Sequence, residues 1–217
     1  MSRYRIAILI SGRGSNMSAL IDTSKDLNYP AQVALVLSNR ADAPGLKIAQ
    51  AANIPTKVIS HKDFGNRVSF DIAITKEMVA CNIQLICLAG FMRLLGEEFC
   101  QRWKDKIINI HPSLLPAFKG LDVHKRMLEA GVRIAGCTVH FVRPAMDEGP
   151  ILVQAAVPIA EDDTPDSLSK RILQQEHRIY PLAVRLIADG NVRIADHKVT
   201  VINTRLPQDV LINPPVG

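Results

Sequence analysis

The stretch that most constrains this chain is residues 107–116, where an apolar strand pattern runs into polar groups and then two prolines. Side chains two apart in a strand point to the same face, so Asn109 and His111 project together while the isoleucines between them point away. Pro112 disfavours helical geometry at His111. An amide and an imidazole therefore lie side by side at a strand end, the edge where open α/β sheets bind ligands. The alternative on this stretch alone is a core histidine beside a capping asparagine.

Strand and helix patterns alternate through the first half of the chain. Strands are expected at residues 4–10, 32–37, 56–59, 83–88 and 107–111, and helices at 17–21, 46–52, 66–81 and 97–103. This alternation predicts an α/β fold, with a mostly parallel twisted sheet and helices on both faces. In the helix at 66–81, Val68, Ile72 and Val79 are expected to form part of the buried apolar face.

The second half changes pattern. Strands expected at 137–142 and 151–159 predict an antiparallel addition to the sheet, and a short helix is expected at 123–130. A long helix is expected from Thr164 to residue 187, with Pro165 at its first position. We expect a single domain over residues 1–217, with an irregular tail from about 206.

Composition narrows the function classes. The net charge of +5, from 26 basic and 21 acidic residues, suits anionic small molecules but lacks the dense basic clusters of a nucleic-acid surface. The four cysteines show no metal-ligand spacing, so we expect reduced thiols, no metal and a cytoplasmic location. No apolar run approaches the length of a signal peptide core or a membrane span. A soluble protein without membrane partners is expected.

A glycine-rich turn, residues 12–16, lies between the first strand and the first helix. Small residues there let backbone N–H groups reach an anion at the positive end of a helix. Met17 stands where the dinucleotide fingerprint needs a third glycine, and no Walker lysine follows, so a nicotinamide cofactor is rejected. The turn at residues 12–16 remains as a site for one phosphate, with a plain tight turn as the alternative.

Asp147 lies in a loop bounded by Pro144 and Pro150. A carboxylate there is commonly a turn former. Its functional interpretation is as a charge partner that keeps His111 protonated and fixes its tautomer. The spacing of His111 and Asp147 in the sequence does not indicate whether the two side chains are in contact.

The other histidines have weaker cases. His61, His124 and His197 stand among polar neighbours and are expected to be solvated. His140 lies in an apolar strand and suits a core or supporting role. The polar cluster at 174–177 could line a pocket or form an exposed helix face.

Several motifs, in order, closely resemble the phosphoribosylglycinamide formyltransferases: residues 10–16, 88–93, 109–116, 136–142, 146–150 and 175–177. The resemblance covers about residues 5–205. It implies a Rossmann-like formyltransferase fold, with 10-formyltetrahydrofolate as formyl donor co-substrate and no metal. The implied acceptor is the amine of N1-(5-phospho-D-ribosyl)glycinamide (glycinamide ribonucleotide), in de novo purine (IMP) biosynthesis. The protein is expected to be a monomer or a weak homodimer.

The resemblance also implies site residues. The catalytic trio would be Asn109, His111 and Asp147. The acceptor nucleotide would contact Gly14, Ser15, Asn16 and Glu176. The folate would contact Arg67, Met92, Arg93, Leu94, Leu95, Asn109, Arg143, Pro144, Ala145, Met146 and Asp147. Two residues depart from the family pattern. Many bacterial members carry histidine at the position of Asp122, and the position of Leu173 is often polar. Both departures affect the expected contacts to the acceptor and not the expected reaction.

The implied chemistry is direct acyl transfer. The acceptor amine attacks the formyl carbon, and Asn109 and protonated His111 donate hydrogen bonds to the oxyanion of the tetrahedral intermediate. Asp147 would order a water that carries the amine proton to the leaving folate nitrogen.

The sequence also bears on three rival functions. A formyltetrahydrofolate deformylase shares the Asn-His-Asp core, but has no use for a phosphate loop and tends to carry a second histidine where this chain has Pro112. A methionyl-tRNA formyltransferase would need a further C-terminal domain and a more basic surface. A non-catalytic mononucleotide-binding module would have no use for Asn109, His111 and Asp147 together.

Overall fold

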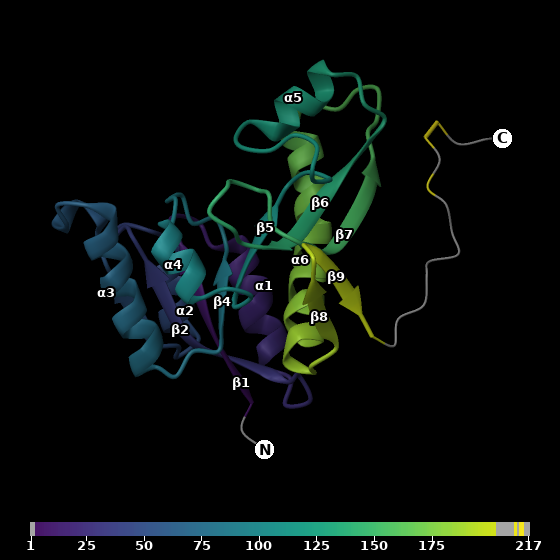
Figure 1. Cartoon of the computed structure of the whole chain (residues 1–217). Coiled ribbons are helices and arrows are strands. Elements are labelled where there is room, and N and C mark those ends of the chain that lie inside the picture. The colour runs from purple at the N-terminus through teal and green to yellow at the C-terminus, as the bar shows by residue number, and fades with distance from the viewer. Residues whose placement is uncertain (1–2, 203–210, 212, 215–217) are drawn as a thin grey trace.

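A computed structural model of the chain describes residues 3–202, 211 and 213–214. Its centre is a seven-stranded sheet in the order β3-β2-β1-β4-β5-β6-β7 (Figure 1). The strands are β1 (Tyr4–Ile10), β2 (Ala31–Ser38), β3 (Thr56–Val58), β4 (Leu85–Leu88), β5 (Ile107–His111), β6 (Ile134–Phe141) and β7 (Ile151–Pro158). Strands β1 to β5 pair in parallel, whereas β6 runs antiparallel to both β5 and β7. The predicted parallel sheet with an antiparallel addition is confirmed.

Helices cover both faces of the sheet, as predicted. One face carries α1 (Ser15–Ser24), α2 (Gly45–Ala51), α5 (Val123–Glu129) and α6 (Pro165–Ala188). The other carries α3 (Arg67–Ala80) and α4 (Glu97–Arg102), preceded by a short 3₁₀ turn, η1 (His61–Asp63).

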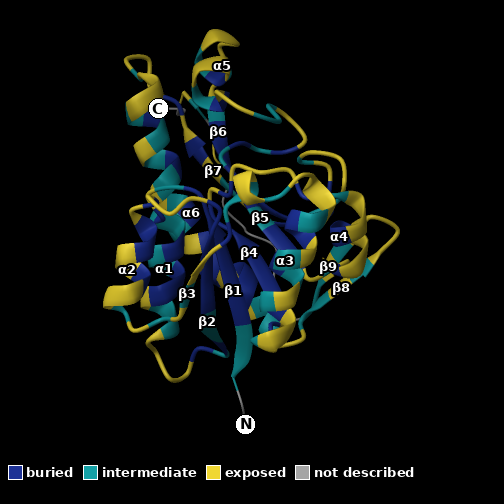
Figure 2. Ribbon diagram, turned by 90° about the vertical axis from the view of Figure 1, so that its left-hand side faces the viewer, coloured by how far each residue is buried: buried dark blue, intermediate teal, exposed yellow. Residues whose placement is uncertain are grey.

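Alternation along the strands builds a hydrophobic core on each face. In β1, Ile6 and Ile8 pack on the α1 and α6 side, whereas Ala7 and Leu9 pack on the α3 and α4 side. Figure 2 shows the result, with buried strands between helices whose outer surfaces are exposed.

The structure corrects the expected apolar face of α3. Val68, Ile72 and Val79 are 48%, 51% and 52% exposed. A different row of side chains at helical spacing packs on the sheet instead: Phe70, Ile74 and Met78. Both rows satisfy the same periodicity, and the row containing the phenylalanine buries more apolar surface.

A two-stranded hairpin, β8 (Val192–Ala195) and β9 (Lys198–Val201), follows α6 and was missed by the sequence analysis. Its two-residue turn holds Asp196 and His197 at φ values of 47° and 63°. That conformation is typical of tight hairpin turns, which usually have asparagine or glycine at these positions. The Asp-His pair is therefore a weak sequence indication of a hairpin. Most of the tail expected from about residue 206 lies outside the described residues.

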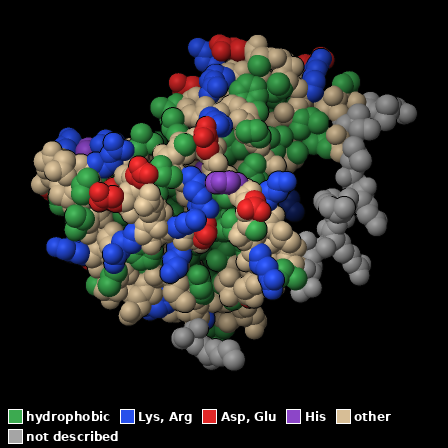
Figure 3. All heavy atoms as spheres, viewed as in Figure 1, with side chains coloured by type: hydrophobic (Ala, Val, Ile, Leu, Met, Phe, Trp, Pro, Cys, Tyr) green, Lys and Arg blue, Asp and Glu red, His purple; other side chains and the backbone are tan. Residues whose placement is uncertain are grey.

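All four cysteines, which lie within the described part, are free thiols, and three of them are buried. None of the helices described here combines the length and apolar composition needed to cross a membrane. Lys and Arg side chains are spread over the face shown in Figure 3, with Asp and Glu side chains among them.

The sheet order locates the functional edge. The chain starts at β1, builds outward to β2 and β3, and then returns to add β4 on the other side of β1. The loops after β1 and β4 therefore leave a crevice between them at the carboxyl edge, where doubly wound sheets bind ligands. Strand β5 ends at the same edge beside β4, which brings Asn109 and His111 to this crevice.

Candidate active site

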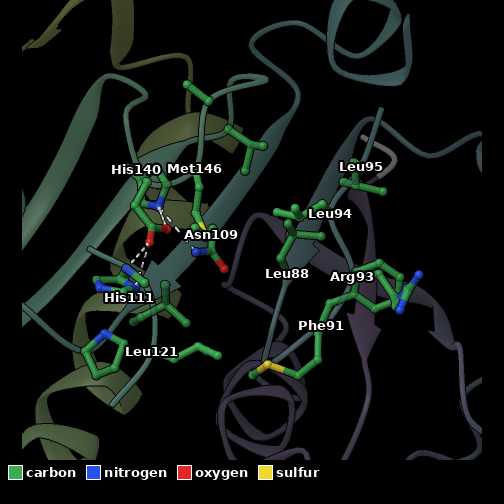
Figure 4. A pocket seen from close by; sticks show the side chains of 18 of the residues that line it. Leu88, Phe91, Arg93, Leu94, Leu95, Asn109, His111, Leu121, His140 and Met146 are labelled. Atoms are coloured by element: carbon green, nitrogen blue, oxygen red, sulfur yellow. Dashed lines mark hydrogen bonds and ion pairs between the residues drawn. The ribbon is translucent and has the colours of Figure 1, made fainter. Parts of the chain in front are cut away.

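Asn109 and His111 end β5 and face one cavity, as the two-residue spacing predicts (Figure 4). Ile108 and Ile110 point to the opposite face and pack in the core under α1 and α6. His111 is only 5% exposed, so the orientation of its ring is set by protein contacts.

A backbone carbonyl fixes the tautomer of His111. Its Nε2 lies 3.0 Å from the carbonyl oxygen of Phe118, which can only accept, so Nε2 carries the hydrogen. The hydroxyl of Ser113 donates to the carbonyls of Ala117 and Phe118, at 2.7 Å and 3.2 Å, and holds this loop in place. The Nδ1 atom of His111 is therefore the nitrogen left to face the cavity and Asp147.

The structure brings Asp147 to His111. The Oδ2 atom of Asp147 lies 3.5 Å from His111 Nδ1 and accepts a hydrogen bond of 2.9 Å from the backbone N–H of Gly120. Asp147 has a φ of 55°, in the left-handed region that aspartate tolerates better than most residues. A loop carboxylate is thus held, nearly buried, against the imidazole.

His140, which was expected in a core or supporting role, joins this group as a buried partner of Asn109. Its Nδ1 donates to the Phe141 carbonyl at 3.1 Å, so in the neutral ring Nε2 is an acceptor, 3.3 Å from Asn109 Nδ2. Asp147 Oδ1 lies 3.7 Å from the same nitrogen. Burial lowers the pKa of His140, although the Phe141 carbonyl and Asp147 favour the charged ring. A neutral His140 holds the Asn109 amide with its nitrogen toward β6.

The cavity beside these residues has a volume of about 360 Å³. Ten of the eleven residues predicted to contact folate line it: Met92, Arg93, Leu94, Leu95, Asn109, Arg143, Pro144, Ala145, Met146 and Asp147. Arg67 does not; it lines two neighbouring cavities, one shared with Leu95 and Pro144 and the other with residues 92–94.

Asp122 and His124 also line this cavity. His124 was expected to be solvated, and this was wrong: it is half-buried, and its Nε2 is buried with no hydrogen-bond partner among the residues that the structure describes. Burial and, to a lesser extent, His111 lower the pKa of His124. Polar neighbours in the sequence gave no sign of this, because the ring packs where α5 meets the end of β5.

The predicted phosphate loop forms the N-terminus of α1. Gly14 precedes the helix with a φ of 77°, which glycine adopts without strain. Gly14, Ser15 and Asn16 line a cavity of about 450 Å³ that also reaches Met92 and Arg93. Glu176, on α6, accepts a 2.6 Å hydrogen bond from Asn16 Nδ2.

Burial raises the pKa of Glu176, and the hydrogen bond from Asn16 opposes this shift. The predicted acceptor contacts therefore lie together, although they come from α1 and from α6. Leu173, half-buried, lies one turn before Glu176 on the same helix. Within the described residues, no group of three or more His, Cys, Asp and Glu side chains could hold a metal ion.

Comparison with known proteins places the chain in a family. Residues 4–184 match the model of the family described as "Formyl transferase". The chain belongs to the formyl transferase family. The predicted family resemblance and fold class are thereby confirmed.

Relatives of this formyl transferase fall into two groups. A trifunctional purine biosynthetic protein adenosine-3 from Gallus gallus is 48% identical over 90% of the chain, which spans only 19% of that relative's length. A phosphoribosylglycinamide formyltransferase from Haemophilus influenzae is 41% identical over 96% of the chain and 99% of the relative.

Solved structures share the fold. The glycinamide ribonucleotide transformylase 1 of Symbiobacterium toebii matches with a TM-score of 0.90 and 45% identity, over 93% of this chain and 95% of the other. A formyltetrahydrofolate deformylase from Pseudomonas syringae matches with a TM-score of 0.86 but 21% identity, over 93% and 67%, a likeness of fold alone.

Proposed function

We propose that this formyl transferase moves the formyl group of 10-formyltetrahydrofolate to the amine of N1-(5-phospho-D-ribosyl)glycinamide, in de novo purine biosynthesis in the cytoplasm. The observation that carries the proposal is the convergence of Asn109, His111 and Asp147 on one cavity beside the loop at Gly14–Asn16. Relatives named for this reaction, aligned over nearly their whole length, support it.

The donor would occupy the cavity of about 360 Å³, whose wall is largely apolar, with the formyl group at Asn109 and His111. Arg67, outside that cavity, would contact the distal, anionic end of the folate. The acceptor phosphate would bind the backbone N–H groups of Gly14–Asn16, where the helix dipole favours an anion. Glu176, held by Asn16, would contact the acceptor nucleotide.

The amine attacks the formyl carbon, and negative charge develops on the formyl oxygen. Asn109 has one amide hydrogen directed to His140 and a second available to this oxygen. Protonated His111 donates through Nδ1, because its Nε2–H is committed to Phe118. Two preorganised donors held in place by the protein stabilise this charge more than they would in bulk solvent.

The attacking nitrogen must lose a proton and the leaving folate nitrogen must gain one. Asp147 contacts His111 and can orient a water between the two nitrogens. This water can accept the proton from the attacking amine and donate one to the leaving folate nitrogen. Collapse of the intermediate then breaks the bond from carbon to the folate nitrogen. The proposed sequence forms no covalent enzyme intermediate.

The rival function is hydrolysis of the same donor. Transfer and hydrolysis differ in product, since hydrolysis releases formate and does not need the acceptor. The test is to mix purified protein with both substrates and to measure formylated acceptor and formate. Formylated acceptor in proportion to tetrahydrofolate is expected. Formate release at the same rate without acceptor would replace the proposal by a deformylase activity, and no turnover of either kind would leave a binding module.

A further inference from the structure

Two buried polar side chains at the switch point belong to neither the predicted catalytic group nor the predicted substrate contacts. Ser11 follows β1 and Asn39 follows β2, and they are only 6% and 3% exposed. Buried polar groups destabilise a fold unless they are hydrogen-bonded. Their partners therefore indicate what they hold together.

The hydrogen bonds of this pair form a continuous chain across the crevice. The backbone N–H of Met92 donates to Ser11 Oγ at 2.8 Å, and the Ser11 hydroxyl donates to Asn39 Oδ1 at 2.5 Å. Asn39 Nδ2 lies 3.3 Å from His61 Nδ1, which must accept, because an amide nitrogen can only donate. The backbone N–H of Ser11 adds a bond of 3.1 Å to the Gly90 carbonyl.

Each direction in this chain of bonds depends on the next. Met92 N–H can only donate, so the Ser11 hydroxyl must turn its own hydrogen to Asn39. The Asn39 amide then has one orientation, oxygen to Ser11 and nitrogen to His61. A polar network of this kind, with Ser11 and Asn39 buried at its centre, favours one geometry for the segments that it joins.

The joined segments serve different substrates in the proposed function. Ser11 leads directly into the Gly14–Asn16 loop assigned to the acceptor phosphate. Met92 belongs to the segment, residues 90–95, that lines the donor cavity. One cavity, of about 450 Å³, is lined by both segments and by Asn39 and His61.

We propose that Ser11 and Asn39 are positioning residues that couple the acceptor loop to the donor loop. This inference rests on the proposed function, which assigns a substrate to each loop. Acceptor bound at Gly14–Asn16 reduces the motion of the loop at its start, Ser11. Because the Met92 N–H donates to the Ser11 hydroxyl, the donor loop at Met92 also becomes less mobile. The donor then meets a wall that is already ordered, so each substrate raises the affinity for the other by the same factor.

The test uses a pair of ligands that cannot react: tetrahydrofolate, which carries no formyl group, and the acceptor nucleotide. Calorimetry gives the Kd of tetrahydrofolate with and without saturating acceptor. In the wild-type chain the acceptor is expected to lower that Kd by about 5-fold or more. In Ser11→Ala the factor should fall close to one, because Met92 N–H loses its acceptor.

Two further variants separate coupling from general damage. Ser24→Ala removes a serine hydroxyl at the other end of α1, which donates to the Ile21 carbonyl within the same helix, and should leave the factor unchanged. Asn39→Ala should lose coupling as Ser11→Ala does, and the double variant should be no worse than either. Circular dichroism checks that each variant is folded.

Equal affinity with and without acceptor in the wild-type chain would overturn the inference, and so would a coupling factor that survives in Ser11→Ala. Either result is distinct from a failure of the proposed function. Wild-type protein that transfers formyl normally but shows no coupling contradicts only the inference, whereas protein that transfers none contradicts the proposed function itself.

Discussion

At the scale of single residues, the site is organised by two imidazoles that share one carboxylate but have different roles. His111 and His140 both contact Asp147, at 3.5 Å and 3.7 Å. Backbone carbonyls hold them in opposite tautomers, through Nε2 in His111 and through Nδ1 in His140. His111 therefore directs Nδ1 toward the cavity, whereas Nε2 of His140 accepts a hydrogen bond from the Asn109 amide.

Alanine at either oxyanion donor is expected to remove most of the transfer activity. Asn109→Ala or His111→Ala should lower turnover by on the order of 100-fold or more, because one preorganised hydrogen bond to the charged intermediate is lost. Steady-state kinetics with both substrates measure this, and urea unfolding verifies that the fold is retained. Near-normal turnover in His111→Ala would contradict the assigned mechanism.

The buried state of His140 predicts a pH dependence of stability. Its pKa is lowered by burial, so the unfolded chain binds this proton more readily, and stability falls as the pH drops below the unfolded value of about 6.5. Gln at position 140 can still accept from Asn109 but does not titrate. Urea unfolding of wild-type and His140→Gln protein between about pH 8 and 5.5 should show a difference in unfolding free energy that is constant above about pH 7 and shifts against the wild type below it.

Other groups with shifted pKa values titrate in both proteins and cancel in this comparison. The pKa of His177 is also lowered by burial, and that of Glu176 is raised. A wild-type curve parallel to that of His140→Gln throughout the range would show that His140 does not have to remain neutral in the fold.

At the scale of elements, function lies where secondary structures end. The N-terminus of α1, the end of β5 and the loop after β4 meet at one edge of the sheet, and each contributes groups to the site. The hydrogen bond from Asn16 to Glu176 ties α1 to α6 across the acceptor side. Elements that meet at their ends thus bring together residues that are far apart in the sequence.

The α1 N-terminus predicts that the acceptor is held through its phosphate. Removing the phosphate deletes charge-assisted hydrogen bonds to backbone N–H groups at Gly14–Asn16, so the dephosphorylated acceptor should bind at least about tenfold more weakly. Calorimetry with both forms of the acceptor measures the ratio. Raising the salt concentration serves as a control, since it should weaken only the phosphorylated form. Equal affinities would remove the phosphate assignment.

At the scale of the whole molecule, one sheet carries two hydrophobic cores. Neighbouring residues of β1 enter opposite cores, so neither core can form without the strand that they share. The lone tryptophan, Trp103, is buried in the core under α3 and α4. Its fluorescence therefore reports on that face alone.

We propose that residues 1–217 act as a single domain, which predicts one cooperative unfolding transition. Urea curves from Trp103 fluorescence and from far-ultraviolet circular dichroism should have the same midpoint, because the circular dichroism signal also reports on the other face, where α6, the longest of the described helices, packs. Two separated midpoints would show that the faces unfold independently. Sedimentation of the same samples tests the predicted monomer or weak homodimer.

Local rules were enough for much of this protein. The period of two along residues 107–111 placed Asn109 and His111 on one face, and the glycine-rich turn was placed before the first helix. The order of strands and helices predicted a mostly parallel sheet with an antiparallel addition. These properties depend on the backbone geometry of a few consecutive residues, which the sequence encodes directly.

Tertiary structure alone decided the rest. The row of α3 that is buried, the nitrogen of His111 that faces the cavity and the entry of His140 and His124 into the site depend on packing against distant segments. Phe118 and Gly120 contact the site through backbone atoms, which every residue carries. The type of side chain at these positions therefore could not predict their role. Which distant residue a side chain contacts depends on how the sheet and its loops pack together. Local sequence patterns do not encode that packing.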